Sequence, residues 1–140
     1  RWSRWDYAVI VIPPVGNTTR WYRLQPYSGG DIDVIGYHAT SSGVPVQESG
    51  RAWVEDDAIR SVAPMRHGMS GGPVLSNGYA SGVASQLWWR DNTLQAVSLT
   101  PERIESIRLA CERMGCHPDI VGQSYRVGLP IIRSSGAMGG

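Results

Sequence analysis

One serine stands in a setting where its hydroxyl could act as a nucleophile. Ser70 lies in the stretch Arg66–Leu75, which contains the order Gly-Met-Ser-Gly-Gly-Pro. Gly68 permits a tight turn in which its own N–H and that of Ser70 converge on one point and form an oxyanion hole. Because a serine hydroxyl is a poor nucleophile without a base, this chemistry also needs a histidine and a carboxylate that orients it. A glycine-rich turn without chemistry is the alternative for so short a pattern.

The elements that must position this serine are short strands, with turn residues about every eight to twelve positions. Such spacing is typical of an antiparallel barrel or sandwich. Asn77-Gly78 predicts a two-residue hairpin, because both residues accept positive φ. The expected strands are Tyr7–Ile12, Arg20–Leu24, Asp31–Tyr37, Gly50–Val54, Ile59–Val62, Pro73–Leu75, Tyr79–Trp89 and Thr93–Val97.

One helix is predicted after these strands, over Thr100–Met114. Thr100 is a good N-cap, Pro101 suits the first helical position, and Gly115 provides a left-handed stop. Apolar residues at steps of three and four form one stripe that we expect to pack on the barrel as core. Its members are Ile104, Ile107, Cys111 and Met114.

Composition limits the possible function classes. The 140 residues are 41% hydrophobic and 18% charged with a formal net charge of +1, which indicates a folded chain rather than disorder. Near-neutral charge argues against nucleic acid, and no apolar run is long enough for a membrane span. All basic residues are arginine, which excludes lysine chemistry. Cys111 and Cys116 lack zinc-site spacing, so a local disulfide and two reduced thiols both stay open, and no metal or other cofactor is expected.

The longer string Gly-Met-Ser-Gly-Gly-Pro-Val, inside a strand-rich pattern, resembles the nucleophile loop of chymotrypsin-like serine proteases. Trp5–Ile10, with an acid followed by Tyr-Ala and an apolar strand, resembles the segment that carries the aspartate in that family. Tyr79–Ser85 resembles the strand that walls the specificity pocket. Pro14–Tyr22 and Asp33–Tyr37 look closest to the bacterial glutamyl-endopeptidase branch. The resemblance covers about Trp5–Met114.

This resemblance implies an all-β fold: an antiparallel Greek-key six-stranded barrel, the second barrel of a chymotrypsin-like double barrel, with a C-terminal helix. Ser70 would be the nucleophile, Asp6 would orient the histidine, and the N–H groups of Gly68 and Ser70 would form the oxyanion hole. The expected division is residues 1–14 as the last strand of the first barrel and the connection, 15–99 as the second barrel, 100–115 as the helix, and 116–140 as a C-terminal extension.

The resemblance also implies a substrate pocket. Met65 and Ala84 occupy positions where glutamate-specific relatives have a hydroxyl residue and a histidine, so we expect a small or apolar pocket. Arg66 and His67 could admit an acid at its rim. Pro64 stands about where trypsin-like enzymes have an aspartate for basic side chains. The expected pocket residues are Met65, Arg66, His67, Val83, Ala84 and Ser85.

The chain departs from the family in its histidines. The family's histidine precedes the aspartate by tens of residues, whereas only five residues precede Asp6. His38 is expected in an exposed loop, His67 at the pocket rim and His117 beyond the helix, and none fits the family position. We therefore expect a serine endopeptidase for polypeptide substrates that receives its histidine from the N-terminal part of the same protease or a companion chain. Alone, the chain would be inactive.

An alternative is a catalytically inactive protease-fold module that serves binding or structural assembly. Its partner surface would include Trp88-Trp89 and an edge strand at Tyr125–Ile132. The family resemblance further implies an extracellular or periplasmic location.

Overall fold

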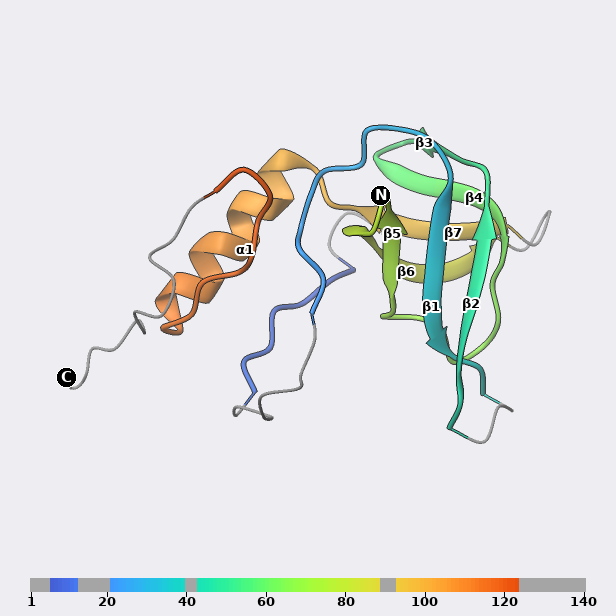
Figure 1. Cartoon of the computed structure of the whole chain (residues 1–140), viewed down its shortest axis with the longest axis horizontal. Coiled ribbons are helices and arrows are strands. Elements are labelled where there is room, and N and C mark those ends of the chain that lie inside the picture. Colours follow the sequence, from blue (N-terminus) through green and yellow to red (C-terminus); the bar gives the residue numbers. More distant parts are fainter. Residues whose placement is uncertain (1–5, 13–20, 40–42, 89–92, 124–140) are drawn as a thin grey trace.

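The computed structural model describes residues 6–12, 21–39, 43–88 and 93–123, and shows a curled antiparallel sheet with one helix beside it (Figure 1). The strands are β1 (Ile32–Tyr37), β2 (Pro45–Gly50), β3 (Ala52–Glu55), β4 (Ala58–Pro64), β5 (Pro73–Ser76), β6 (Tyr79–Trp88) and β7 (Thr93–Ser98). The helix α1 spans Pro101–Arg113. The predicted class, mostly β with a C-terminal helix, is therefore confirmed.

The strand order in the sheet is β2-β1-β5-β6-β7-β4-β3, and every pairing is antiparallel. The two outermost strands, β2 and β3, are separated in sequence only by Arg51. The Arg51 carbonyl accepts a hydrogen bond from the Val62 N–H at 3.1 Å, and β2 also contacts β4. The sheet therefore curls into a half-barrel. The sheet has seven strands where six were predicted, because Arg51 separates β2 from β3. Of these two strands, β2 pairs with β1 and β3 pairs with β4.

Most predicted strands are present within a few residues of the expected bounds. β2 was not predicted, because Pro-Val-Gln-Glu-Ser-Gly carries few β-branched residues and lies half exposed. The prediction of a strand at Tyr7–Ile12 is wrong, since this segment joins no ladder in the part of the chain that the structure describes. Among the described residues of the predicted strand Arg20–Leu24, which are 21–24, only Leu24 forms isolated bridges, to Ala80 and to Ile120.

The main core fills the inside of the curled sheet. Along β7, Leu94 and Ala96 are fully buried and belong to this core, as the period-2 alternation of a strand requires. Met69 is also fully buried there, although it belongs to a loop. The buried members are Ile32, Val34, Ile59, Ala63, Met65, Met69, Val74, Ala84, Leu94 and Ala96.

α1 packs against one end of the sheet over a second, smaller cluster, in which Leu99, Ile104 and Ile120 are buried. Thr100 caps the helix as predicted, because its hydroxyl accepts the Arg103 N–H at 3.2 Å. The predicted stripe ends earlier than expected. Met114 is 47% exposed, since it is the C-cap and lies past the last helical turn.

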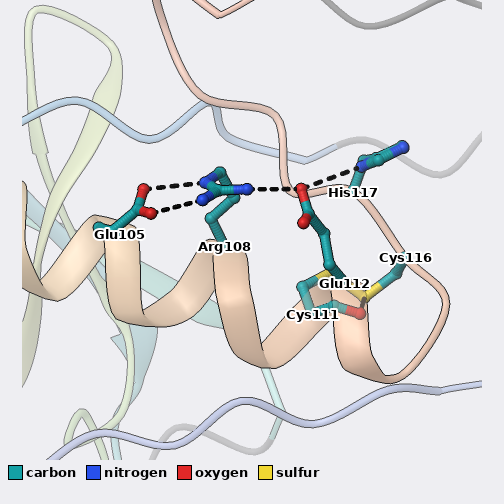
Figure 2. A network of polar contacts seen from close by, with 6 residues as sticks. All are labelled: Glu105, Arg108, Cys111, Glu112, Cys116 and His117. Carbon is teal, nitrogen blue, oxygen red and sulfur yellow. Dashed lines mark hydrogen bonds and ion pairs between the residues drawn. A yellow bond between two sulfur atoms is a disulfide. The ribbon is translucent and has the colours of Figure 1, made fainter.

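After α1 the chain returns to the barrel. A disulfide joins Cys111 to Cys116, at the turn where α1 ends (Figure 2). The returning segment then pairs with Leu24, whose N–H donates to the Asp119 carbonyl at 2.7 Å. The predicted edge strand Tyr125–Ile132 and Trp89 lie outside the described residues. Among the residues that are described, no helix is long and apolar enough to cross a membrane.

A polar ladder runs along the exposed side of α1 (Figure 2). Arg108 is paired with Glu105 and, at 2.8 Å, with Glu112. The Glu112 carboxylate also lies 3.8 Å from His117 Nδ1. These contacts one helical turn apart, together with the disulfide, fasten the end of α1 to the returning chain.

Candidate active site

The loop between β4 and β5, which contains Ser70, lies directly against β1. A Cβ atom at Gly72 would overlap the Ile35 carbonyl oxygen, and one at Gly68 would stand 2.5 Å from the Tyr37 carbonyl oxygen. Glycine is therefore required at both positions by close backbone approach. At Gly68 the positive φ of 99° adds a second requirement.

Backbone hydrogen bonds and one buried side chain fix the loop further. Met69 is inserted into the main core, which leaves its neighbour Ser70 exposed at the surface. The hydrogen bonds from N–H to carbonyl are Ala39 to His67 (2.7 Å), Met69 to Arg66 (3.2 Å), Gly72 to Met69 (3.1 Å), Gly71 to Ala84 (2.7 Å) and Ala84 to Gly72 (2.9 Å).

The backbone N–H groups on either side of Met69 are relevant to an oxyanion hole. The Met69 N–H is taken by the Arg66 carbonyl. The N–H groups of its neighbours Gly68 and Ser70 donate to no acceptor among the residues that the structure describes. Unpaired donors on either side of Met69 are what an oxyanion hole needs, because they can bind an oxygen that gains negative charge.

Ser85 connects the two residues that the sequence assigned to catalysis. The Ser70 Oγ donates a 2.9 Å hydrogen bond to the Ser85 carbonyl oxygen. The Ser85 Oγ donates a short hydrogen bond to Asp6 Oδ2. The sequence placed Ser85 only in a pocket wall, yet the structure brings Asp6 and Ser70 to this one residue of β6.

The backbone explains how Ser85 reaches both partners. Ala84 pairs with Ala96 of β7, and Gln86 pairs with the next residue, Gln95. Ser85 is therefore the extra residue of a β-bulge. A bulge interrupts the ladder and redirects the groups of the extra residue, which leaves the Ser85 carbonyl available to Ser70.

One cavity, of about 550 Å³, borders both Asp6 and Ser70. Val83 and Ala84, which were expected in the substrate pocket, lie on this cavity instead. None of its described lining residues is a histidine. These residues are Asp6, Tyr7, Ala8, Ser70, Gly71, Val83, Ala84 and Ser85.

A second cavity, of about 590 Å³, lies on another side of Ser70. It contains the expected pocket residues Met65, Arg66 and His67, and it shares Ser70 and Ser85 with the first cavity. Sequence reasoning missed His38, Ala39, Gln86 and Leu87, which also line this cavity.

His38 lies in a loop as predicted, but the prediction that it is exposed is wrong, since it is half-buried and lines the second cavity. At the mouth of this cavity, Arg66 forms a 3.5 Å ion pair with Glu48 of β2. Among the described side chains, no group of three or more His, Cys, Asp or Glu residues gathers as a metal site.

Two solved structures are similar to this architecture. The solved structure of catalytically inactive tobacco etch virus protease complexed with substrate matches with a TM-score of 0.54 and 15% identity, over 88% of this chain and 55% of that one. Catalytically active tobacco etch virus protease complexed with product matches with a TM-score of 0.50 and 15% identity, over 87% and 51%. At such identity the likeness shows the fold alone.

The chain spans about half the length of these viral proteases. No protein-family model matches the chain. No curated protein matches it at a significant level.

Proposed function

We propose that this chain is the C-terminal part of a chymotrypsin-like serine endopeptidase. If β2 and β3 are counted as one bent strand, the sheet corresponds to a six-stranded Greek-key barrel, the second of two. Residues 1–14 would then end the first barrel, 15–99 would form the second, 100–115 the helix and 116–140 an extension. Sequence similarity near Pro14–Tyr22 favours the bacterial glutamyl-endopeptidase branch as its relatives.

In this proposal Ser70 attacks the carbonyl carbon of a peptide bond in a polypeptide substrate. A histidine takes the Ser70 proton and passes it to the departing amine, which leaves an acyl group on Ser70. Asp6 orients that histidine and stabilises its charged form. The N–H groups of Gly68 and Ser70 bind the oxygen that becomes negative, and water then releases the acyl group. No cofactor takes part in these steps.

One observation carries the proposal: Asp6 and Ser70 border the same cavity, and its described lining holds no histidine. A cavity of about 550 Å³ has room for an imidazole between the carboxylate and the hydroxyl. The two described histidines near Ser70, His38 and His67, lie on the other cavity. The catalytic histidine is therefore proposed to come from an N-terminal segment or a companion chain.

An extracellular or periplasmic location follows from the resemblance to chymotrypsin-like proteases alone. We include this location in the proposal.

Labelling with a fluorophosphonate tests the proposal, since this reagent reacts with activated serines. The chain alone is expected to stay unlabelled. With the proposed histidine-bearing N-terminal part supplied in the same polypeptide or as a second chain, Ser70 is expected to be labelled, as read by mass spectrometry. Asp6→Asn should slow labelling by up to about 10⁴-fold, because the histidine loses its orientation.

Two results would count against the proposal, with Ser70→Ala as the control for reagent specificity. Labelling of Ser70 in the chain alone would show that the base is internal. Absence of labelling in the folded longer protein would instead favour the inactive binding or assembly module.

A further inference from the structure

We infer that the second cavity, the one lined by Met65, binds an apolar, uncharged substrate side chain of about the size of leucine or methionine. The inference rests on the proposed function, because that function makes this cavity the site for the residue whose peptide bond is cut. Ser70 borders the cavity, so a side chain inside it belongs to a residue held next to the nucleophile.

The walls of the cavity are mainly carbon. Ala39, Met65 and Leu87 come from three different parts of the chain: the end of β1, the end of β4, and β6. Met65 is only 8% exposed and belongs to the main core, and Leu87 packs against the same core. These walls are therefore held by the fold. A charged group placed against them would lose hydration without gaining a partner.

The charges around the cavity disfavour a basic side chain. None of the described lining residues is an acid, and the ionisable ones among them are His38, Arg66 and His67. A lysine or arginine side chain would meet these groups, and the Glu48 carboxylate at the mouth is already paired with Arg66. An acidic side chain is also disfavoured, because the Glu48 carboxylate already pairs with Arg66 at 3.5 Å.

The cavity has room for a side chain of this size, since its volume is about 590 Å³. Adding or removing one methylene in an apolar pocket changes recognition by roughly 10- to 200-fold. Leucine and methionine are therefore expected to bind at least about tenfold better than alanine.

Peptide binding tests the inference without requiring catalysis. The probes are acetylated hexapeptides of one sequence that differ only in their last residue: leucine, methionine, alanine, glutamine, glutamate or lysine. Their dissociation constants are measured by NMR titration against the chain with Ser70→Ala. Leucine and methionine should bind at least about tenfold tighter than the other four.

A charge substitution provides a gain of binding that unfolding cannot mimic. Gln86 lines the cavity and is exposed, so Gln86→Glu adds a carboxylate with no change of shape. The lysine-ended peptide should then bind roughly two- to fivefold tighter, as for a half-exposed ion pair. Gln47→Glu, on the exposed face of β2 and outside the cavity, is the matched control and should leave that affinity unchanged.

The inference is overturned if the glutamate- or lysine-ended peptide binds tightest. It is equally overturned if the six peptides bind alike or not at all. Each experiment refutes one proposal without deciding the other. Absence of Ser70 labelling in the longer protein refutes the proposed function and does not change the peptide ranking. A different peptide ranking refutes this inference and does not change the labelling result.

Discussion

Replacing Gly72 by alanine should disrupt the contact between the Ser70 loop and β1. Gly72 has no positive φ, so alanine meets no backbone strain there. The added Cβ would instead overlap the Ile35 carbonyl oxygen, a backbone atom inside the ladder of β1. Because β1 is paired with β2 and β5, the loop rather than the strand must move.

The expected loss of stability follows from two costs and one smaller gain. Overpacking a close contact costs roughly 1–3 kcal/mol. Moving the loop also weakens the hydrogen bond from the Gly72 N–H to the Met69 carbonyl at 3.1 Å, worth about 0.5–1.5 kcal/mol. Alanine recovers about 0.4–1 kcal/mol by restricting the unfolded chain. We expect the free energy of unfolding to fall by about 2–3 kcal/mol.

Urea unfolding followed by tryptophan fluorescence measures this loss, and Gly36→Ala is the matched control. At Gly36 a Cβ would lie 3.1 Å from Met69 Cα in the same loop contact, a crowding that a shift of a few tenths of an ångström relieves. Its cost should be about 1 kcal/mol or less. If Gly72→Ala is no less stable than Gly36→Ala, close packing of the loop on β1 does not explain why glycine is required at position 72.

Three further predictions concern the helix and the returning chain. Replacing Cys111 and Cys116 by alanine should lower the unfolding free energy by about 2 kcal/mol, because the disulfide closes a six-residue loop. A reducing agent should destabilise the parent chain and leave the double variant unchanged. Thr100→Ala should lower the free energy of unfolding by about 1 kcal/mol in the same urea assay, because the Arg103 N–H loses its cap. Thr100→Ser keeps a hydroxyl at this position and should lower it much less. Hydrogen bonds from Trp21 and then Arg23 hold the pKa of Asp119 below its ordinary value. The stability that this group contributes is therefore present above pH about 4 and is lost as pH falls through the lower folded pKa. In Asp119→Asn, the free energy of unfolding measured with urea should depend less on pH between pH 5 and pH 3. The same pH dependence as in the parent chain would contradict this.

Local sequence signals predicted the elements whose residues decide their own structure. The N-cap at Thr100 and the hairpin at Asn77-Gly78 depend on neighbours within a few positions, and both are confirmed. Tyr7–Ile12 has a strand-like pattern but joins no ladder among the described residues, because pairing depends on a partner strand that no local pattern contains. The same limit explains β2, whose pairing with β1 compensates for a weak intrinsic preference.

The same distinction, between features that depend on neighbouring residues and features that depend on distant strands, applies to the candidate site. Gly68 and Gly72 could be assigned from the motif, since a tight loop requires glycine wherever two backbones meet. The two cavities could not be separated from sequence: Met65 and Ala84 are both buried, yet they face different cavities beside Ser70. Which cavity a β6 residue faces depends on the bulge at Ser85, and a bulge is a property of two paired strands.

That bulge also determines what the chain contributes to a catalytic site by itself. It places the Ser85 carbonyl as the acceptor for the Ser70 hydroxyl, and this hydrogen bond directs the Ser70 proton to a carbonyl that cannot take it. The same residue donates to Asp6 and so holds the carboxylate beside the cavity. In the proposed function, Asp6 and Ser70 already border the cavity that would receive the base. An imidazole supplied between Asp6 and Ser70 has only to replace the Ser85 carbonyl as acceptor, a change of one hydrogen bond.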